Sequence, residues 1–404
     1  MSYSSTHSSA SEAVRTLHEY YFKSDWQGTD PGDFIWRFRS IPFPQGSEAL
    51  YYVADGYLGP SITASAIARK LLRIRNHWEP KALTVFARAY VGLEQQRMVD
   101  SALNIATRLC DVVWNLRNRE TKYPSWGLSF PMRAEGHVFL PANTPTALIT
   151  ALAGLAFLDV YQATGNEEHL NRAKSAGLYV SRELGRTDYP EGICFWYTPV
   201  MQKRIHNANA LAAMFLNRLG RVTSVHEFEL LADSAYSLLI SRQSRIGGWN
   251  YLVDGKARAR LFDNFHTGFI IESLLRYRGR LVDEVRKSVE NALTFYRRLF
   301  DSSGVPLFNL ARSYPKDIHD VAQGVLVFSL AQLELGVGLA EAQRIWQFAH
   351  RCLRRRDGTF ISRVYRYGRS KANYPRWADS WMLLGLSELL KALSSTSPQR
   401  CVSA

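Results

Sequence analysis

Residues 265–275 read FHTGFIIESLL, and residues 282–300 read VDEVRKSVENALTFYRRLF. The first stretch is apolar on nearly every face, which predicts a helix that is buried all round. The second carries apolar residues at helical spacing and a charged opposite face, which predicts a helix on the outside of the same domain. Together the two stretches describe one helical hairpin with an inner and an outer member.

This hairpin recurs along the chain. Each unit ends in a short segment of glycine and aromatic residues, and after a loop a new apolar helix begins. The glycine-aromatic segments are WGLSF (126–130), GICFWY (192–197), GGWNY (247–251), GVPLF (304–308) and DGTF (357–360). The apolar helices are expected to open near TPTALITAL (144–152), HNANALAAMFL (206–216), FHTGFIIESLL (265–275), IHDVAQGVLVFSL (318–330) and RWADSWMLLGL (376–386). With residues 206, 266, 319 and 377 taken as equivalent, the spacings are 60, 53 and 58 residues, a period typical of a stacked or closed helical array.

Residues 80–118 supply one earlier hairpin, which makes six inner helices. The last inner helix, expected at 376–393, has no outer partner after it, and an N-terminal helix at 11–24 or 61–76 is expected to supply one. We therefore predict an all-α fold, a closed α/α toroid of six helical hairpins. Residues 1–60 are expected to pack on the ring, 61–393 to form the toroid, and 394–404 to be a disordered tail.

Composition and charge limit the classes of partner that this protein is expected to bind. The chain has 404 residues, 46% hydrophobic, with a formal net charge of +14, which favours a polyanionic partner, a solvated basic surface being the alternative. No nucleic-acid-binding motif accompanies the charge, so nucleic acid is not expected. The four cysteines are scattered without metal-ligand spacing, and neither a metal nor another cofactor is expected. The N-terminus lacks a signal core and no apolar run of membrane-spanning length is evident, which predicts a cytoplasmic protein, with a peripheral place at a membrane synthesis complex as an alternative.

The inner helices of a toroid run parallel, so their N-termini and the loops before them meet on one rim. Helix N-termini present positive dipole ends and free N–H groups, which suit an anionic or hydroxyl-rich ligand. The candidate catalytic residues on this rim are His266, His319, Asp263, Asp317, Tyr197 and Tyr374. The candidate substrate-binding residues are His206, Asn207, Asn264, Asp320, Arg376, Trp377, Trp126, Arg133 and Arg204.

Each candidate also has a structural interpretation. Asp263, Asp317 and Asn207 could cap helices, and a single buried histidine is usually structural. Three histidines at equivalent positions favour a role in catalysis for at least one of them. The tryptophans at 126, 196, 249 and 377 suit the core and the stacking of sugar rings equally well.

The segments NTPTALITAL, CFWYTP, HNANALAA, DNFHTGF, YPKDIHDVAQ and RWADSWM resemble the motif series of bacterial proteins encoded in exopolysaccharide clusters, over roughly residues 120–393. ARLFDNFHTGF is similar to one segment in the helical domain of glucuronyl C5-epimerases, whose catalysis is associated with tyrosines and an acid in the cleft; Tyr197, Tyr314 and Tyr374 are the positions available here. QSRIGGW (243–249) resembles the pattern that ends hairpins in terpene-cyclase toroids, but the acid and metal motifs of those enzymes are absent from the sequence.

The leading hypothesis is therefore an enzyme that epimerises or eliminates at a uronate of an acidic polysaccharide or its lipid-linked precursor, together with other polysaccharide-synthesis proteins. His266 or His319 would act as base, Tyr197 or Tyr374 as acid, and Arg376, Arg204 or Arg133 would hold the carboxylate. Glycoside hydrolysis is the alternative within the same class and requires two carboxylates, Asp263 with Asp317 or Asp320, with Glu135 in reserve. A glycan-binding or scaffold subunit without catalysis is the alternative from another class.

Overall fold

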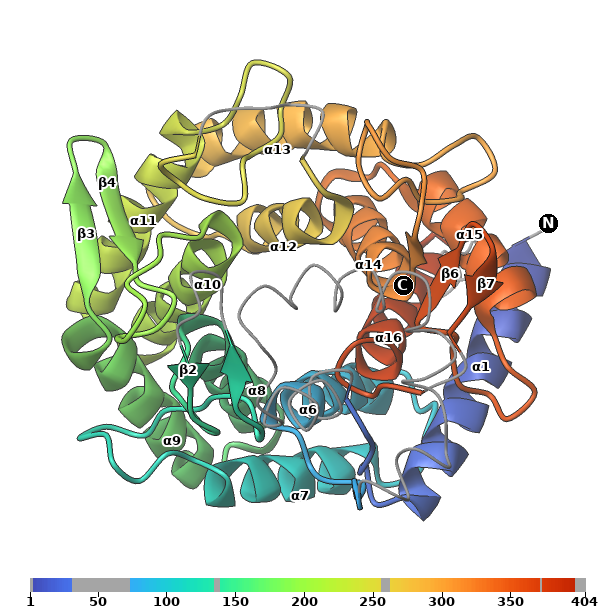
Figure 1. The fold of residues 1–404 in the computed structure, drawn as a ribbon, viewed down its shortest axis with the longest axis horizontal. Coiled ribbons are helices and arrows are strands. Elements are labelled where there is room, and N and C mark those ends of the chain that lie inside the picture. Colours follow the sequence, from blue (N-terminus) through green and yellow to red (C-terminus); the bar gives the residue numbers. More distant parts are fainter. Residues whose placement is uncertain (1–2, 31–72, 134–138, 256–261, 371–372, 397–404) are drawn as a thin grey trace, which may run out of the picture.

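The computed structural model describes residues 3–30, 73–133, 139–255, 262–370 and 373–396. Its helices form two concentric rings (Figure 1), and the predicted closed toroid of six hairpins is confirmed. The inner helices are α6 (Pro80–Gln95), α8 (Ala147–Thr164), α10 (His206–Thr223), α12 (Asn264–Leu275), α14 (Ile318–Leu335) and α16 (Asp379–Ser395). The outer helices are α7 (Ala102–Asn115), α9 (Glu167–Leu178), α11 (His226–Ser241), α13 (Val282–Arg297), α15 (Leu339–Phe348) and α1 (Tyr3–Lys23).

The ring closes where the last inner helix meets the first. Gln96, at the end of α6, donates a hydrogen bond from Nε2 to the carbonyl oxygen of Ser387 in α16 at 3.0 Å. Gly92 faces the same residue, and a Cβ there would lie 2.3 Å from Ser387 Oγ. The two helices therefore pack with almost no space between their backbones at this seam.

Helix α1 is the outer partner of α16. It contacts α16 and α15 (Figure 1), and Trp346 of α15 donates from Nε1 to Ser9 Oγ at 3.0 Å. Of the two closing helices expected from the sequence, the one at 11–24 thus takes this place, beginning earlier than expected. Most of the alternative at 61–76 lies outside the described residues, as do residues 397–404 of the expected tail, and the proposed domain limits stay predictions.

Local sequence sets where the inner helices begin and end. Thr146 accepts the N–H of Ile149 at 3.0 Å and caps α8, which Gly165 ends in the left-handed conformation at φ 70°. Glu79 caps α6 through a bond from Ala82 N at 3.0 Å, with Pro80 in the first helical position, where proline is favoured. On the outside, π-helical turns at Tyr179–Glu183 and Ala349–Leu353 extend α9 and α15.

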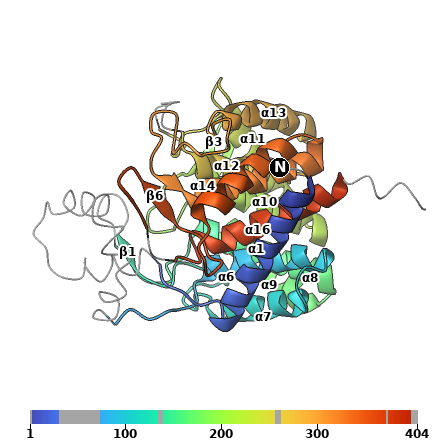
Figure 2. The ribbon, with the colours of Figure 1, turned by 90° about the vertical axis from the view of Figure 1, so that its right-hand side faces the viewer.

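Short antiparallel strands shape the connections. β1 (Met132–Arg133) pairs with β2 (Phe139–Leu140), β3 (Arg186–Tyr189) with β4 (Gly192–Phe195), and β6 (Arg363–Tyr365) with both β5 (Lys316–Asp317) and β7 (Gly368–Arg369). Figure 2 shows β1 and β6 on the same side of the helices. β5 leads directly into α14, so its pairing with β6 fixes the entry to that inner helix.

Charged side chains meet inside the ring below the rim. Arg88 of α6 contacts Glu272 of α12 at 3.2 Å, although these helices lie on opposite sides of the ring (Figure 1). Arg88 also contacts Asp159 of α8 at 3.2 Å, and both Arg88 and Glu272 are buried. Further ion pairs join Arg218 to Asp159 and Arg276 to Glu388. The network holds three arginines and three carboxylates, so it is neutral overall while it spans the axis of the ring.

One sequence-based expectation requires correction here. α8 is long and apolar enough to cross a membrane by length and composition, although no such run was expected. In the structure it is an inner helix, and its residues from Ala147 to Leu158 are all buried. Its apolar character on every face follows from contact with helices on several sides.

Candidate functional site

A histidine–aspartate pair stands at the start of α12. Asp263 is the N-cap: its Oδ1 accepts the N–H of His266 at 3.0 Å, and its Oδ2 lies 2.8 Å from His266 Nδ1. Because a carboxylate accepts, Nδ1 carries the proton and donates, which leaves the lone pair on Nε2. The His266 side chain is 26% exposed and that of Asp263 18%. This is the arrangement of an oriented general base that a ligand can reach.

The three phenylalanines around this pair anchor it. Phe262 packs edge-on against Phe295 of α13, with ring centroids 5.8 Å apart. Phe269 contacts Trp381 of α16 at 4.8 Å. Phe265 packs between the histidine rings of 266 and 319, with centroids at 4.0 and 4.7 Å. All three are buried, so they fix the start of α12 while His266 remains accessible.

Asp317, a second candidate, is fully engaged. Its Oδ1 accepts the N–H of His319 at 2.9 Å and the indole N–H of Trp377 at 2.8 Å. Its Oδ2 accepts from Arg363 Nε at 2.6 Å, and the residue is completely buried. Asp317 therefore caps α14 and joins it to the segments carrying Arg363 and Trp377.

His319 does not line an open cleft, contrary to the expectation from sequence. Its ring is completely buried, stacked on Phe265 and 5.2 Å from the rings of both Trp377 and Trp381. Burial, with the charge of Lys81 as the next cause, holds the pKa of His319 well below its usual range. It is a neutral histidine behind the partly exposed His266.

The histidines differ because their positions in the helices differ. His206 is the first residue of α10, His319 the second of α14 and His266 the third of α12, whereas Trp377 precedes α16. Successive helical residues point about 100° apart, so these side chains face different directions. The predicted equivalence of the four positions is thus wrong by one to four residues. His206 turns away and places Nδ1 2.8 Å from the carbonyl oxygen of Asn250.

Two of the three candidate arginines are already paired. Arg376 donates from Nη2 to Asp30 Oδ1 at 2.8 Å, and Arg204 donates from Nε to Asp254 Oδ2 at 2.8 Å. Asp254 also accepts from Tyr189 of β3, so Arg204 lies beside the β3–β4 hairpin. Arg133 lies in β1.

The remaining candidates are mostly buried. Asn264 donates to the carbonyl oxygen of Leu299 at 3.2 Å, and Asp320 Oδ1 accepts the N–H of Phe265 at 3.1 Å. Burial and the neighbouring Asp317 and Asp263 raise the pKa of Asp320 well above its usual range. Trp126 belongs to the core, where its indole donates to the carbonyl oxygen of Val113 at 2.7 Å. Asn207 and Tyr374 are buried and Tyr197 is half-buried.

Tyr197 shares the rim with Arg376. Burial raises the pKa of the Tyr197 phenol, and the charge of Arg376 acts in the opposite direction. Trp377 is partly buried, and the guanidinium of Arg363 lies 4.8 Å from its ring. Tyr197 and Trp377 thus lie at the rim on different hairpins. Glu135 lies outside the described residues.

The start of α6 adds two residues that the sequence reasoning missed. Burial raises the pKa of Glu79 to about 7 and lowers that of Lys81 to about 7. Glu79 Oε1 has no hydrogen-bond partner within the described part of the chain. Residues 79–81 lie outside the four positions, 206, 266, 319 and 377, that the sequence pattern treats as equivalent. The sequence signal was Glu-Pro-Lys at residues 79–81, a capping acid before a proline.

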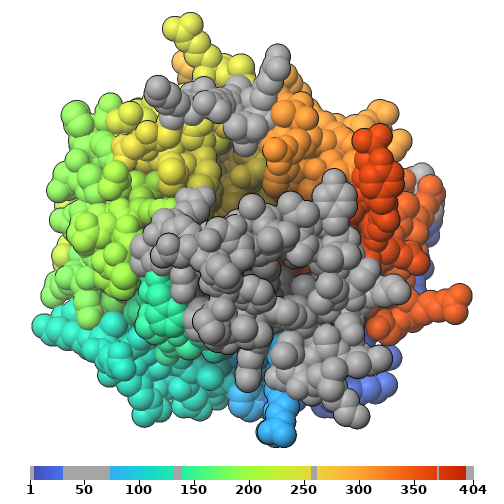
Figure 3. Space-filling model, viewed as in Figure 1, coloured from blue at the N-terminus to red at the C-terminus, as the bar shows by residue number. Residues whose placement is uncertain are grey.

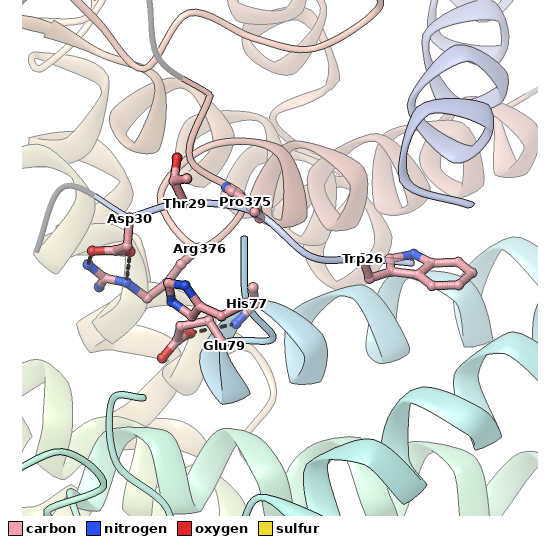
Figure 4. A pocket seen from close by; sticks show the side chains of 9 residues that line it. Trp26, Thr29, Asp30, His77, Glu79, Pro375 and Arg376 are labelled. Carbon is pink, nitrogen blue, oxygen red and sulfur yellow. Dashed lines mark hydrogen bonds and ion pairs between the residues drawn. The ribbon is translucent and has the colours of Figure 1, made fainter. Parts of the chain in front are cut away.

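A small pocket lies beside Glu79 (Figure 4). It is lined by Trp26, Gly28, Thr29, Asp30, His77, Glu79, Ala82, Pro375 and Arg376. The Asp30–Arg376 ion pair forms one side of it, and Glu79 reaches it from α6. The pocket therefore joins the segment after α1 to the N-terminal ends of α6 and α16.

The fold with this rim is similar to that of several solved enzymes. A cellobiose 2-epimerase from Bacillus thermoamylovorans superposes with a TM-score of 0.60 at 12% identity, covering 79% of this chain and 90% of that one. A family 88 glycosyl hydrolase from Bacteroides vulgatus gives 0.59 at 9% identity, covering 86% and 99%. A polysaccharide lyase gives 0.59 at 9% identity, covering 98% and 100%. At these identities the likeness shows a common fold. No protein-family model and no curated protein matches the sequence.

Proposed function

We propose that this protein is a carbohydrate-active enzyme that transfers a proton at a ring carbon of a uronate, with His266 as the base. The observation that carries the proposal is the bond between His266 Nδ1 and Asp263 Oδ2 at 2.8 Å, which leaves Nε2 of a partly exposed ring as the nitrogen that accepts a proton. The shared fold supports the general class, because the similar structures are named as a sugar epimerase, a glycoside hydrolase and a polysaccharide lyase.

The reaction begins when His266 Nε2 takes the proton from C5 and becomes an imidazolium, which Asp263 stabilises. The electron pair of the broken C–H bond moves into the adjacent carboxylate and forms an enediolate. Return of a proton to the opposite face gives the C5 epimer; departure of the group at C4 instead gives an unsaturated sugar. Tyr197 and Glu79, both on the rim, are the groups that supply the second proton.

Hydrolysis with paired carboxylates fits the contacts less well. Both oxygens of Asp263 and both oxygens of Asp317 are occupied by hydrogen bonds to protein groups. Asp320 is completely buried and bonded to the backbone of Phe265. Retaining and inverting hydrolysis each need one carboxylate facing the anomeric carbon or its water. The contacts of these three aspartates therefore favour proton transfer.

An acidic polysaccharide or its lipid-linked precursor is the substrate class that we propose. The formal charge of +14 supports an anionic partner, and the resemblance to exopolysaccharide-cluster proteins supports a place in polysaccharide synthesis. Association with other synthesis proteins and a cytoplasmic location, peripheral to a membrane complex, belong to the same proposal.

Incubation in deuterated water tests the reaction. The protein is mixed with candidate acidic polysaccharides, and products are followed by proton NMR, with His266→Ala as the control. Deuterium at C5 without chain cleavage is the expected result for epimerisation, and an olefinic signal is expected for elimination. A new reducing end without an olefinic signal or deuterium would identify a hydrolase, and no change in any polysaccharide would favour a binding protein.

A further inference from the structure

Lys81 is a buried lysine without a polar partner among the described residues. It is the second residue of α6 and is only 7% exposed. Its amine faces aromatic rings: Nζ lies 5.7 Å from the ring centroid of Phe269 in α12 and 5.5 Å from that of Trp381 in α16. Aromatic faces attract a cation, but they stabilise its charge less than water or an anion does.

The surroundings of Lys81 place it within the group of residues around His266. Phe269, which it contacts, is one turn from His266 on the same helix. The charges that act on Lys81 come from Arg376, Glu79 and Asp30, and Lys81 in turn acts on His319. Arg376 and Asp30 neutralise each other, and burial raises the pKa of Glu79 to about 7. No carboxylate of the described residues lies within ion-pair distance of Lys81 Nζ.

The other rim cations differ in this respect. Arg376, Arg363 and Arg204 each bind an aspartate of this chain. A guanidinium that already donates to a carboxylate has fewer donors left for a second one. An unpaired buried ammonium, by contrast, gains a full charge-assisted bond when an anion arrives.

We propose that Lys81 binds the carboxylate of an anionic sugar inside the ring, and so selects uronates over neutral sugars. The inference rests on the proposed function for the place of the sugar beside His266. In that arrangement Lys81 Nζ donates to the carboxylate, and during proton removal it stabilises the added negative charge of the enediolate. Arg376 and Arg204, which the sequence suggested would hold the carboxylate, instead form ion pairs with aspartates of this chain.

Protection from acetylation tests this assignment on the whole wild-type chain. A short pulse of acetic anhydride at neutral pH is applied in sodium D-glucuronate, in D-glucose, or in sodium chloride of equal ionic strength. Acetylation of Lys81 is then measured by peptide mass spectrometry, with the exposed Lys287 of α13 as the internal reference. Glucuronate at roughly ten times its dissociation constant should slow acetylation of Lys81 about tenfold, with no change at Lys287. Equal labelling in glucuronate and glucose, or no labelling of Lys81 in any solution, would overturn the proposal.

Two variants provide a second measurement. Lys81→Met keeps the length of the side chain and should weaken glucuronate binding about tenfold or more, while Lys81→Arg should retain most of it. Binding is followed by saturation-transfer NMR, with glucose as the neutral comparison. Equal glucuronate binding by wild type and Lys81→Met contradicts the proposal; if Lys81→Met does not fold, the acetylation result on the wild type decides.

The outcomes separate this inference from the proposed reaction. Protection of Lys81 by glucuronate without deuterium incorporation into any polysaccharide supports the carboxylate site and contradicts proton transfer. Deuterium incorporation with an unprotected Lys81 supports the reaction and contradicts this site.

Discussion

His266 and Asp263 are joined twice, once through the backbone N–H of His266 and once through its ring, at 3.0 and 2.8 Å. The same carboxylate thus caps the N-terminus of α12 and fixes the orientation of the imidazole ring. A capping residue and an orienting residue are usually discussed as alternatives; in this position one aspartate does both. The hydrogen bond from Thr267 Oγ1 to the Asp263 carbonyl oxygen at 2.6 Å holds the cap in place.

We expect His266→Ala to reduce turnover about 100-fold or more, the scale of a lost general base, with little change in melting temperature or glycan affinity. The ring is partly exposed, and its removal leaves the Asp263 cap intact. A melting temperature lower by several degrees, with a proportionate loss of activity, would show that His266 is structural, at a cost of about 1–3 kcal/mol.

Asp263→Asn should separate the two roles of the carboxylate. Asparagine caps a helix about as well as aspartate, so the melting temperature should stay close to that of wild type. The amide cannot stabilise the imidazolium as a carboxylate does, so turnover should fall substantially. Activity at the wild-type level would mean that the pair is only a cap.

Asp317→Asn is the matched variant at the next inner helix. The cap to His319 N and the bond to Trp377 can persist, but Arg363 loses its charged partner, so we expect lower stability and activity retained in proportion to folded protein. Thermal unfolding and initial rates on the same preparation measure both. Abolished turnover at an unchanged melting temperature would instead support hydrolysis with Asp317 as a catalytic acid.

Arg88→Met should destabilise the ring by about 3–5 kcal/mol, because Glu272 would remain buried with one fewer cation beside it. The double variant Arg88→Met with Glu272→Gln removes that uncompensated charge and should recover most of the loss. Urea unfolding of wild type, both single variants and the double variant gives the coupling. Additive losses would show that the two residues do not act as a pair.

Acid should weaken the wild type partly through His206. Burial lowers its pKa to about 4, with Arg242 acting in the same direction and the bond to Asn250 and the charge of Asp254 acting against it. Because the folded pKa lies below the unfolded one, the stabilising contribution is complete above about pH 6.5 and is lost as pH falls towards 4, in total roughly 3 kcal/mol. His206→Gln does not titrate, so its unfolding free energy should fall less steeply over this range. Parallel curves for the two proteins would contradict the prediction.

The fold could be predicted further than the site. The repeated order of an apolar helix, an amphipathic helix and a glycine-aromatic segment predicts the toroid, because an inner helix that is apolar on every face must be buried on all sides. The aspartates at 263 and 317 were recognisable as caps from sequence. Which side chains face the rim depends on where each helix begins, and a difference of one or two residues rotates a histidine into the core, as at His319. Lys81 and Glu79 were missed because α6 contributes none of the positions that the sequence pattern treats as equivalent.

The contact between Arg88 and Glu272 also has a consequence for how a long substrate is handled. It joins helices on opposite sides of the ring, so these two side chains cross the axis of the ring. Figure 3 views the ring along the same direction as Figure 1. Under the proposed function, we expect a glycan that binds at the rim to meet this ion pair on the axis. That favours action on a chain end, or on a segment lying across the rim, over threading of a polymer through the ring.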